Sequence, residues 1–330
     1  MLDRTGQEAA GAGLKSAQAR YAAHAARACG YAFESLDGAD GYLFEVRDGE
    51  RRAVFAAGAG TPYALNDARA ASLARDKAFC AEVLQRAGVP VLPGEMFFVT
   101  KRWAEMRGPG RELEDALAYA ERAAYPIFCK PISASNGLYA EVIESADAFA
   151  DYLTRVAHEH FAVLIQPYVR ADEYRVFVLE GHALFSYRKS APQVVGDGVS
   201  TLAALVEAMP RDPYQPVRKL HGRDGAGQRL GLGDVPGKGQ RVGLEGPANR
   251  AAGGGAEALT DGAPQAMGEV ACAAAKALHL KLAAVDMFDL GGDYTAIEVN
   301  SNPMIATLED HGRWDLIETI WRANFAAALQ

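Results

Sequence analysis

The sequence has few cysteines, no long apolar run and no excess of positive charge. Its four cysteines stand far apart and form no CxxC pair, which argues against a zinc site or a disulfide framework and fits a reducing cytoplasm (Cys29, Cys80, Cys129, Cys272). No apolar run reaches the roughly 18 residues that a membrane span needs, and we expect no signal peptide because the first residues lack an apolar segment. The formal net charge of −8, without a long basic run, argues against nucleic acid as a partner.

The composition is instead that of a globular protein with mixed α/β patterns. Apolar residues make up 49% and charged residues 23% of the 330 residues, which allows two or three packed subdomains. Tight turns at Asp48-Gly49-Glu50, Glu180-Gly181 and Gly291-Gly292 predict strand hairpins. Helices are predicted at 14–29, 67–88, 145–159, 264–279 and 313–328, and strands at 42–48, 51–58, 125–131, 138–144, 162–169, 174–190, 282–290 and 294–303.

One long stretch, about 210–265, is rich in glycine and proline and has no durable periodicity. A segment of this length without secondary structure is usually either a functional loop or disordered. We therefore expect a loop here.

Two carboxylates and an amide fall in the last predicted hairpin. Asp286 lies in the first strand, and Glu298 and Asn300 lie two residues apart in the second, so all three can project from one face. An all-oxygen set of this kind suits Mg²⁺ held together with nucleotide phosphates. The alternative is that they are solvated residues at a strand edge; against it, they lie among Val, Ala, Ile and Met, where an unpaired carboxylate is costly.

Two lysines are candidates for binding phosphate. Lys130 ends a strand and precedes a loop of small, hydrogen-bonding residues (Ser133, Ser135, Asn136, Gly137), which suits an anion, although the GxxxxGK[ST] spacing of a Walker A motif is absent. Lys77 opens the helical segment before GVPVLPG. On its own, a lysine at such a place is more often a solvated surface residue.

A further segment, QPYVRADEYRVFV, can bind a purine nucleotide. The backbone of an exposed strand end can hydrogen-bond a purine ring, and Glu173 can accept from ribose hydroxyls. As a lone pattern it is weak, because polar residues between two strands are common.

Taken in this order, the segments from about residue 70 to 312 resemble the ATP-grasp superfamily, most closely the ATP-grasp domain of cyanophycin synthetase and of the bifunctional glutathione-synthesising enzymes. The matching text is RDKAFCAEVLQRAGVPVLPG, FCKPISASNG, QPYVRADEYRVFVLEG, RKSAPQVVGDGVSTLAALVE, ANRAAGGGAEALTD and AAVDMF with IEVNSNP. The resemblance implies an α/β (α+β) ATP-grasp fold that holds the nucleotide between two subdomains. The expected division is an N-terminal substrate-side domain (1–66), a lid subdomain and linker (67–170), and a core subdomain (171–330) with a large substrate loop at 210–265.

The resemblance also implies roles for individual residues. It assigns the nucleotide to Lys77, Lys130, Ser133, Ser135, Asn136, Gly137, Gln166, Tyr168, Val169 and Glu173. It assigns Mg²⁺ to Asp286, Glu298 and Asn300. Substrate contacts are expected from Arg188, Lys189, Arg241, Asn249, Gly253, Gly254 and Asn302, and catalytic roles from Lys130, Arg188 and Arg250.

Two positions depart from the family pattern. Gln166 stands where the superfamily often has an acid, and it keeps an acceptor oxygen without the charge. The arginine usual just upstream of the glycine-rich segment is replaced by Glu245 in VGLEGPANRAAGG, with Arg241 and Arg250 on either side, so the arginine that stabilises the transferring phosphoryl group stays open. No Mur-ligase-like domain is present in the sequence, so a full cyanophycin synthetase is not expected.

The resemblance predicts an ATP-dependent carboxylate–amine ligase that uses ATP and Mg²⁺, passes through an acyl phosphate and releases ADP and phosphate. Small-molecule acids and amines, such as amino acids or short peptides, are the expected substrates, and a homodimer is compatible with the family. A phosphotransferase and a non-catalytic nucleotide-binding regulator are the alternatives. The intact Asp286, Glu298 and Asn300 set argues against the regulator.

Overall fold

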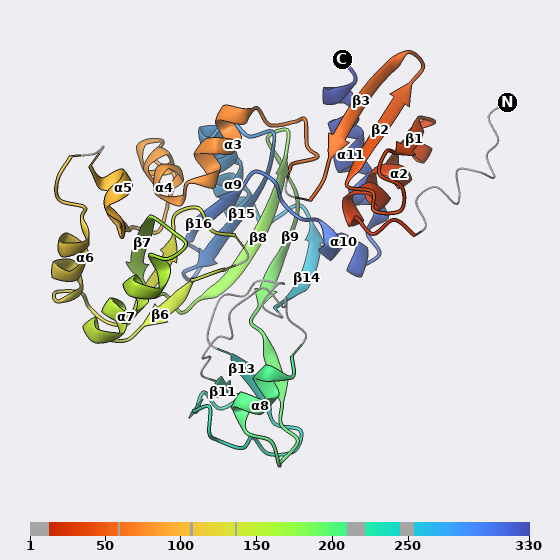
Figure 1. Ribbon diagram of the computed structural model, residues 1–330. Helices are drawn as coiled ribbons and strands as arrows, with labels where there is room; N and C mark the ends of the chain where they lie inside the picture. Colours follow the sequence, from red (N-terminus) through yellow and green to blue (C-terminus); the bar gives the residue numbers. More distant parts are fainter. Residues whose placement is uncertain (1–12, 59, 106–107, 136, 210–221, 245–253) are drawn as a thin grey trace.

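The computed structural model describes residues 13–58, 60–105, 108–135, 137–209, 222–244 and 254–330. Its described part comprises four antiparallel sheets and the helices that cover them. Figure 1 shows an N-terminal unit at one end, a central sheet, a second sheet with its own helices on the other side, and a small lobe that projects from the central sheet. The predicted α+β class is confirmed. None of the helices in these ranges is both long and apolar enough to cross a membrane.

The N-terminal unit is completed by the last helix of the chain. Helix α2 begins after Ser16, whose side chain caps the helix. The sheet of the N-terminal unit includes the hairpin that was predicted at Asp48-Gly49. Aromatic rings from both ends of the chain pack in one core, where the centroids of Phe44, Phe55, Trp321 and Phe325 lie 5.4 to 6.0 Å from their neighbours. The elements are α2 (Ala17–Cys29), β1 (Ala32–Ser35), β2 (Leu43–Asp48), β3 (Arg51–Ala56) and α11 (Trp314–Ala328).

The central sheet has the order β14-β9-β8-β15-β16. Its strands alternate between two cores: Val176 and Val285 face helix α9 on one side, while Phe177 and Ala284 face α10, α11 and the N-terminal unit on the other. This alternation is the period-2 pattern of a sheet covered on both faces. The elements are β8 (Asp172–Leu179), β9 (His182–Ser190), β14 (Gly255–Asp261), α9 (Gln265–Ala277), β15 (Leu282–Asp289), β16 (Tyr294–Asn300) and α10 (Ala306–Asp310).

A second sheet, of order β4-β7-β5-β6, lies in the segment predicted as the lid subdomain. Helices α6 and α7 pack on it around a core that includes Phe97, Phe149 and Tyr152, and the Ser145 side chain caps α7, as predicted. The elements are β4 (Glu95–Phe98), α5 (Lys101–Ala104), α6 (Leu113–Ala120), β5 (Ile127–Pro131), β6 (Glu141–Ile143), α7 (Ala146–Val156) and β7 (Ala162–Pro167). The predicted domain boundaries at residues 67 and 171 stay predictions.

The single helix predicted at 67–88 is wrong. The structure has two helices, α3 (Ala68–Arg75) and α4 (Lys77–Arg86), which Asp76 separates in an extended conformation with φ −86° and ψ 108°. The Asp76 carboxylate accepts from the backbone N–H groups of the first turn of α4, so it acts as an N-cap inside an otherwise helical pattern. This break places Lys77 at the start of a helix.

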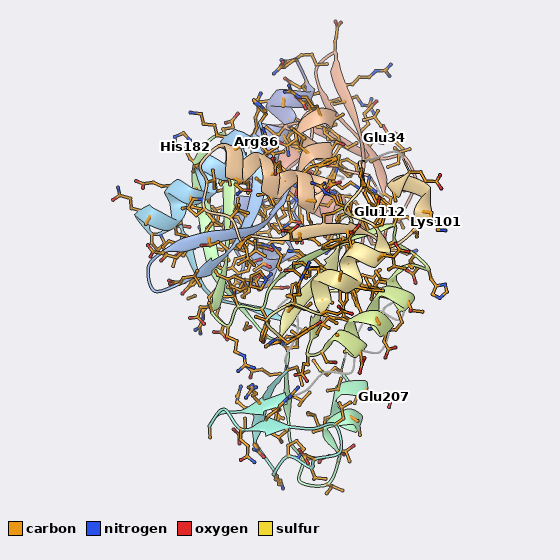
Figure 2. The ribbon with its side chains drawn as sticks, turned by 90° about the vertical axis from the view of Figure 1, so that its left-hand side faces the viewer. Glu34, Arg86, Lys101, Glu112, His182 and Glu207 are labelled. Carbon is orange, nitrogen blue, oxygen red and sulfur yellow. The ribbon has the colours of Figure 1, made fainter. Side chains whose placement is uncertain are left out.

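The expectation of a structureless loop over 210–265 is also wrong for its described residues. Residues 193–209 and 222–244 form a small lobe with a sheet of order β10-β13-β11-β12 and its own core of Val194, Leu202, Leu230, Val242 and Leu244. Figure 2 shows this lobe, with Glu207 on α8, projecting from the rest of the molecule. Its strands are two to four residues long, too short for a periodic pattern. The elements are β10 (Gln193–Val195), α8 (Leu202–Glu207), β11 (Gly222–Asp224), β12 (Arg229–Leu230) and β13 (Arg241–Leu244).

Candidate active site

A row of charged side chains crosses the central sheet. In the strand register, Asp286 lies directly opposite Glu298 on one side and Arg175 on the other, and Arg175 lies opposite Tyr187. Residues directly opposite in antiparallel strands share a face, and Asn300, two residues beyond Glu298, has the same orientation. The common face predicted for Asp286, Glu298 and Asn300 is therefore confirmed.

Arg175 is the main member of this row that the sequence analysis missed. Its Nε lies 2.6 Å from Oδ1 of Asp286 and its Nη2 lies 2.7 Å from Oδ2, a two-point ion pair in which the Asp286 side chain is only 6% exposed. Burial would raise the pKa of Asp286, but the positive charges of Arg175 and Lys189 outweigh it and lower that pKa to about 2. The sequence did contain a signal for Arg175, because a charged residue within the apolar run YRVFVL indicates a buried charge that needs a partner.

A second ion pair lies beside the first. Lys189 contacts the carboxylate of Glu173, the residue opposite it in the register, and its Nζ is also 3.4 Å from Oδ2 of Asp286. Burial raises the pKa of Glu173 more than the attraction of Lys189 lowers it. Two cations and two carboxylates thus alternate on this face.

The two predicted lysines approach this cluster from other elements. Lys77, at the start of α4, has Nζ 3.4 Å from Oε1 of Glu298 and donates to the carbonyl of Ala134 at 2.7 Å. Its side chain is 9% exposed, so the solvated-surface alternative is wrong. Lys77 therefore links the small-residue loop after β5 to a carboxylate of the central sheet.

Lys130 is the last residue but one of β5 and is 4% exposed. Burial lowers its pKa, the negative charge of Glu298 raises it, and the nearby charge of Lys77 lowers it further. Within the described part of the chain, no carboxylate lies at salt-bridge distance from its Nζ. Lys130 is therefore a buried cation without an ion-pair partner in the described structure, with its Nζ 5.9 Å from the centroid of the Phe128 ring.

The residues predicted to bind adenine lie at the end of β7 and directly after it. Gln166 is 1% exposed; its Nε2 donates to the Leu92 carbonyl at 3.1 Å, while its Oε1 is buried without a hydrogen-bond partner. Tyr168 lies under the guanidinium of Arg170, and Val169 is half-buried. Gln166 thus offers an unused acceptor at the predicted place.

Several predicted substrate residues lie elsewhere. Arg188 projects from the opposite face to Lys189 and Arg175, where it pairs with Asp172 and Glu257. Arg241 begins β13 in the small lobe, and the Asn302 side chain contacts Thr61 and the Gly60 carbonyl of the N-terminal unit. Asn136, Asn249, Arg250 and Gly253 lie outside the described residues.

A cavity of 130 Å³ lies on the same face as the charged row, between the sheet and α10. It brings two predicted substrate residues, Lys189 and Gly254, together with Arg175. Its lining is Arg175, Tyr187, Lys189, Gly254, Gly255, Ala256, Met304, Ala306, Thr307, Asp310 and His311.

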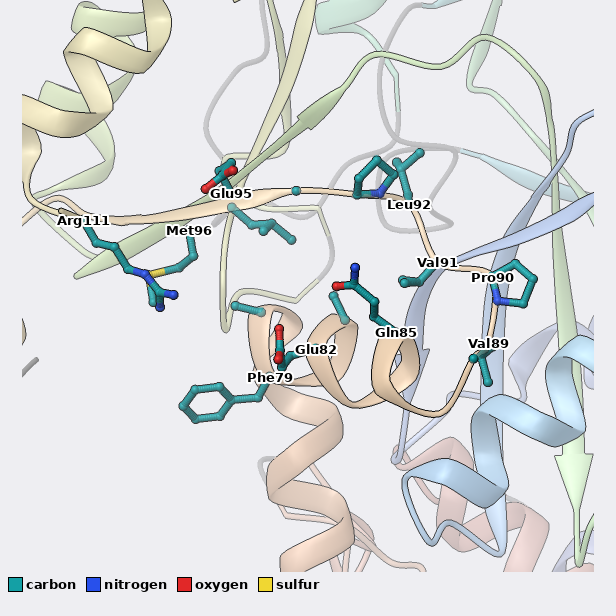
Figure 3. Close-up of a pocket in the computed structure, with 16 residues that line it drawn as sticks. Phe79, Glu82, Gln85, Val89, Pro90, Val91, Leu92, Glu95, Met96 and Arg111 are labelled. Carbon is teal, nitrogen blue, oxygen red and sulfur yellow. The ribbon is translucent and has the colours of Figure 1, made fainter. Parts of the chain in front are cut away.

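A larger cavity, of 540 Å³, lies between α4 and the segment 88–96 that leads into β4. Figure 3 shows Glu82 and Gln85 pointing from the helix toward the segment that carries Leu92 and Met96. None of the charged residues of the row lines it.

The chain is similar to known proteins of glutathione biosynthesis. No protein-family profile matches the sequence. A glutathione biosynthesis bifunctional protein from Desulfotalea psychrophila is 26% identical over 297 residues, 84% of this chain and 36% of the relative. The corresponding protein from Streptococcus mutans is 27% identical over 258 residues, 69% of this chain and 32% of the relative. The chain thus spans about a third of the length of these curated relatives.

Solved structures are similar to the chain as well. A bifunctional glutathione synthetase from Pasteurella multocida matches with a TM-score of 0.49 and 21% identity, covering 92% of this chain and 44% of the other. A D-alanine–D-alanine ligase from Bacillus anthracis matches with a TM-score of 0.48 and 14% identity, covering 78% and 68%.

The sequence relatives confirm the predicted resemblance to the bifunctional glutathione-synthesising enzymes.

Proposed function

We propose that this chain is an ATP-dependent carboxylate–amine ligase that forms an amide or peptide bond through an acyl phosphate and releases ADP and phosphate. The observation that carries the proposal is Lys130, a buried ammonium group without a counter-ion in the described structure. Such a group costs folding free energy unless an anion compensates it. The γ-phosphate of ATP is an anion of the required kind, and Lys77 lies near enough to the cluster to share it.

Gln166 and Glu173 support a site for the rest of the nucleotide. The unpaired Oε1 of Gln166 can accept from the exocyclic amine of adenine, and Glu173 can accept from ribose hydroxyls. Tyr168 and Val169 would complete the adenine site through the backbone, and Ser133, Ser135 and Gly137 would cover the phosphates.

The proposed Mg²⁺ ligands fit a divalent cation in donor type and placement. Asp286 and Glu298 present carboxylate oxygens side by side, and Asp286 keeps lone pairs after bonding Arg175. The Asn300 Nδ2 is buried without a partner, so the protein does not fix the orientation of this amide and its oxygen can serve as a ligand. No group of three or more His, Cys, Asp and Glu side chains able to hold a metal occurs in the described ranges, so the amide is needed. When bound, Mg²⁺ would supply positive charge to the phosphate oxygens.

Arg175 is the arginine that we propose to stabilise negative charge during phosphoryl transfer. It lies in the charged row and lines the cavity beside Gly254, whereas Arg188 faces away. Arg241 lies in the small lobe. We therefore assign to Arg175 the catalytic role that the sequence left open between other arginines.

A ligase is favoured over a phosphotransferase by the 130 Å³ cavity next to the cluster. A ligase needs a protected place where a second substrate meets the acyl phosphate before water does, whereas a phosphotransferase does not. The relatives' names support amino-acid or small-peptide substrates. Single-turnover analysis of the products formed from ATP and mixed amino acids tests the proposal, and ADP with an amide is the expected result.

Two further properties are proposals. The four free thiols support a reducing, cytoplasmic location. A homodimer is compatible with the family, and sedimentation velocity would test it.

A further inference from the structure

We infer that the 130 Å³ cavity receives the amine substrate and that His311 is the catalytic base that removes a proton from its ammonium group. The inference rests on the proposed ligase function. It adds a residue and a chemical class of acceptor, a primary amine that is protonated in solution, to that function.

The hydrogen bonding of His311 fixes which ring nitrogen can act as a base. The residue ends α10, and its Nδ1 lies 2.8 Å from the backbone carbonyl oxygen of Thr307. A carbonyl oxygen only accepts, so in the neutral ring Nδ1 carries the hydrogen and Nε2 carries the lone pair. The side chain is exposed, so water can take the proton away afterwards.

The cavity brings this base to the reacting groups. His311 and Asp310 lie on its α10 side, while Arg175 and Lys189 lie on the sheet side and Gly254 and Gly255 border it. Asp310 places a carboxylate among the residues that line the cavity. The positive charges of Arg175 and Lys189 are opposed by Asp286 and Glu173, which limits their repulsion of that ammonium.

The cavity, of 130 Å³, is large enough for a small organic group, since a cavity of about 150 Å³ can hold a benzene ring. The α-amino end of an amino acid therefore fits. The expected acceptor is a primary amine of this kind.

The proton balance of the reaction requires such a base. An α-amino group is largely protonated at neutral pH, and its nitrogen has no lone pair until Nε2 of His311 accepts one proton. The nitrogen then forms a bond with the acyl carbon, and the bond from that carbon to the phosphate oxygen breaks with its electron pair. The second proton of the amine leaves with the phosphate, and His311 returns the first to water, so one proton is released for each amide formed.

His311→Gln tests this role, because glutamine keeps a hydrogen-bonding side chain but cannot accept a proton at neutral pH. The variant and the wild type are given ATP and mixed amino acids, with and without hydroxylamine, which is largely uncharged at neutral pH and needs no base. We expect amide formation to fall about 100-fold, while hydroxamate formation from the trapped acyl phosphate stays at the wild-type rate. Added imidazole should restore part of the amide formation in His311→Ala.

The matched control is His182→Gln, which changes an exposed histidine at the start of β9, outside the cavity (Figure 2). It should leave both products unchanged. Equal loss of amide and hydroxamate in His311→Gln, or loss of neither, would overturn the role of His311 while leaving the ligase in place. If the wild type makes neither product, the ligase proposal fails and the role of His311 fails with it.

Discussion

Arg175 and Asp286 are directly opposite each other on β8 and β15 and form a two-point ion pair with N–O distances of 2.6 and 2.7 Å. The Asp286 side chain is buried in the central sheet and that of Arg175 is partly exposed, and the two residues are 111 positions apart in the chain. It holds a proposed metal ligand and a proposed catalytic arginine in fixed positions. Its properties can be tested without knowing the substrates.

Removal of Arg175 alone should destabilise the protein. In Arg175→Met the Asp286 carboxylate is left buried without its main counter-ion, and we expect a loss of about 3–5 kcal/mol in the free energy of unfolding. The double variant Arg175→Met/Asp286→Leu should recover most of this loss, because both charges are gone. Urea unfolding measures both variants, and an equal loss in the two would show that the ion pair is not the cause.

Replacement of Lys130 should have the opposite effect on stability. Lys130→Met removes a buried cation that has no ion-pair partner in the described structure, so the midpoint of thermal unfolding should stay unchanged or rise. ATP turnover should be abolished, because the charge that faces the transferring phosphoryl group is lost. A variant that unfolds at lower temperature, or that keeps wild-type turnover, would contradict this account of Lys130.

Stability should depend on Asp286 at acid pH. Its pKa is lowered to about 2 in the folded protein, so the ionised carboxylate contributes stability that is present above the unfolded value near 4 and is lost as pH falls toward 2. The wild type should lose about 2 kcal/mol more than Asp286→Asn across this range. Unfolding curves at pH 5, 4, 3 and 2 for both proteins give the difference, and parallel curves would refute the lowered pKa.

Gln166 should contribute to recognition of adenine. Gln166→Leu removes an acceptor that has no partner in the structure, so we expect weaker ATP binding and a smaller preference for ATP over GTP. Calorimetric titration with each nucleotide measures the two affinities. A variant that keeps the full preference would remove Gln166 from the adenine site.

The sequence was sufficient to predict the elements that lie in one hairpin or one strand. Asp286 and Glu298 could be assigned to one face because a tight turn joins their strands, and Lys130 was recognisable from the loop that follows it. Arg175 could not be placed, because its partner depends on which distant strand pairs with β8 and in which register. Arg188 and Lys189 are neighbours in β9, so their side chains point to opposite faces of the sheet. Which of the two faces carries the charged row is known only from the structure.

Local patterns failed where a single residue or very short strands decide the structure. Asp76 interrupts a continuous helical pattern because its side chain caps the following helix instead of continuing the preceding one. The small lobe packs on five buried aliphatic residues spread over 51 positions, from Val194 to Leu244, with glycines in several strands. No window of the sequence contains enough of that core to predict it.

The products formed from ATP test the central claim most directly. Purified protein is mixed with Mg²⁺, ATP and amino acids, each omitted in turn, and the products are identified by mass spectrometry. Our account predicts an amide together with ADP and phosphate, formed only when both an acid and an amine are present. AMP with pyrophosphate, or a stable phosphorylated product without any amide, would contradict it.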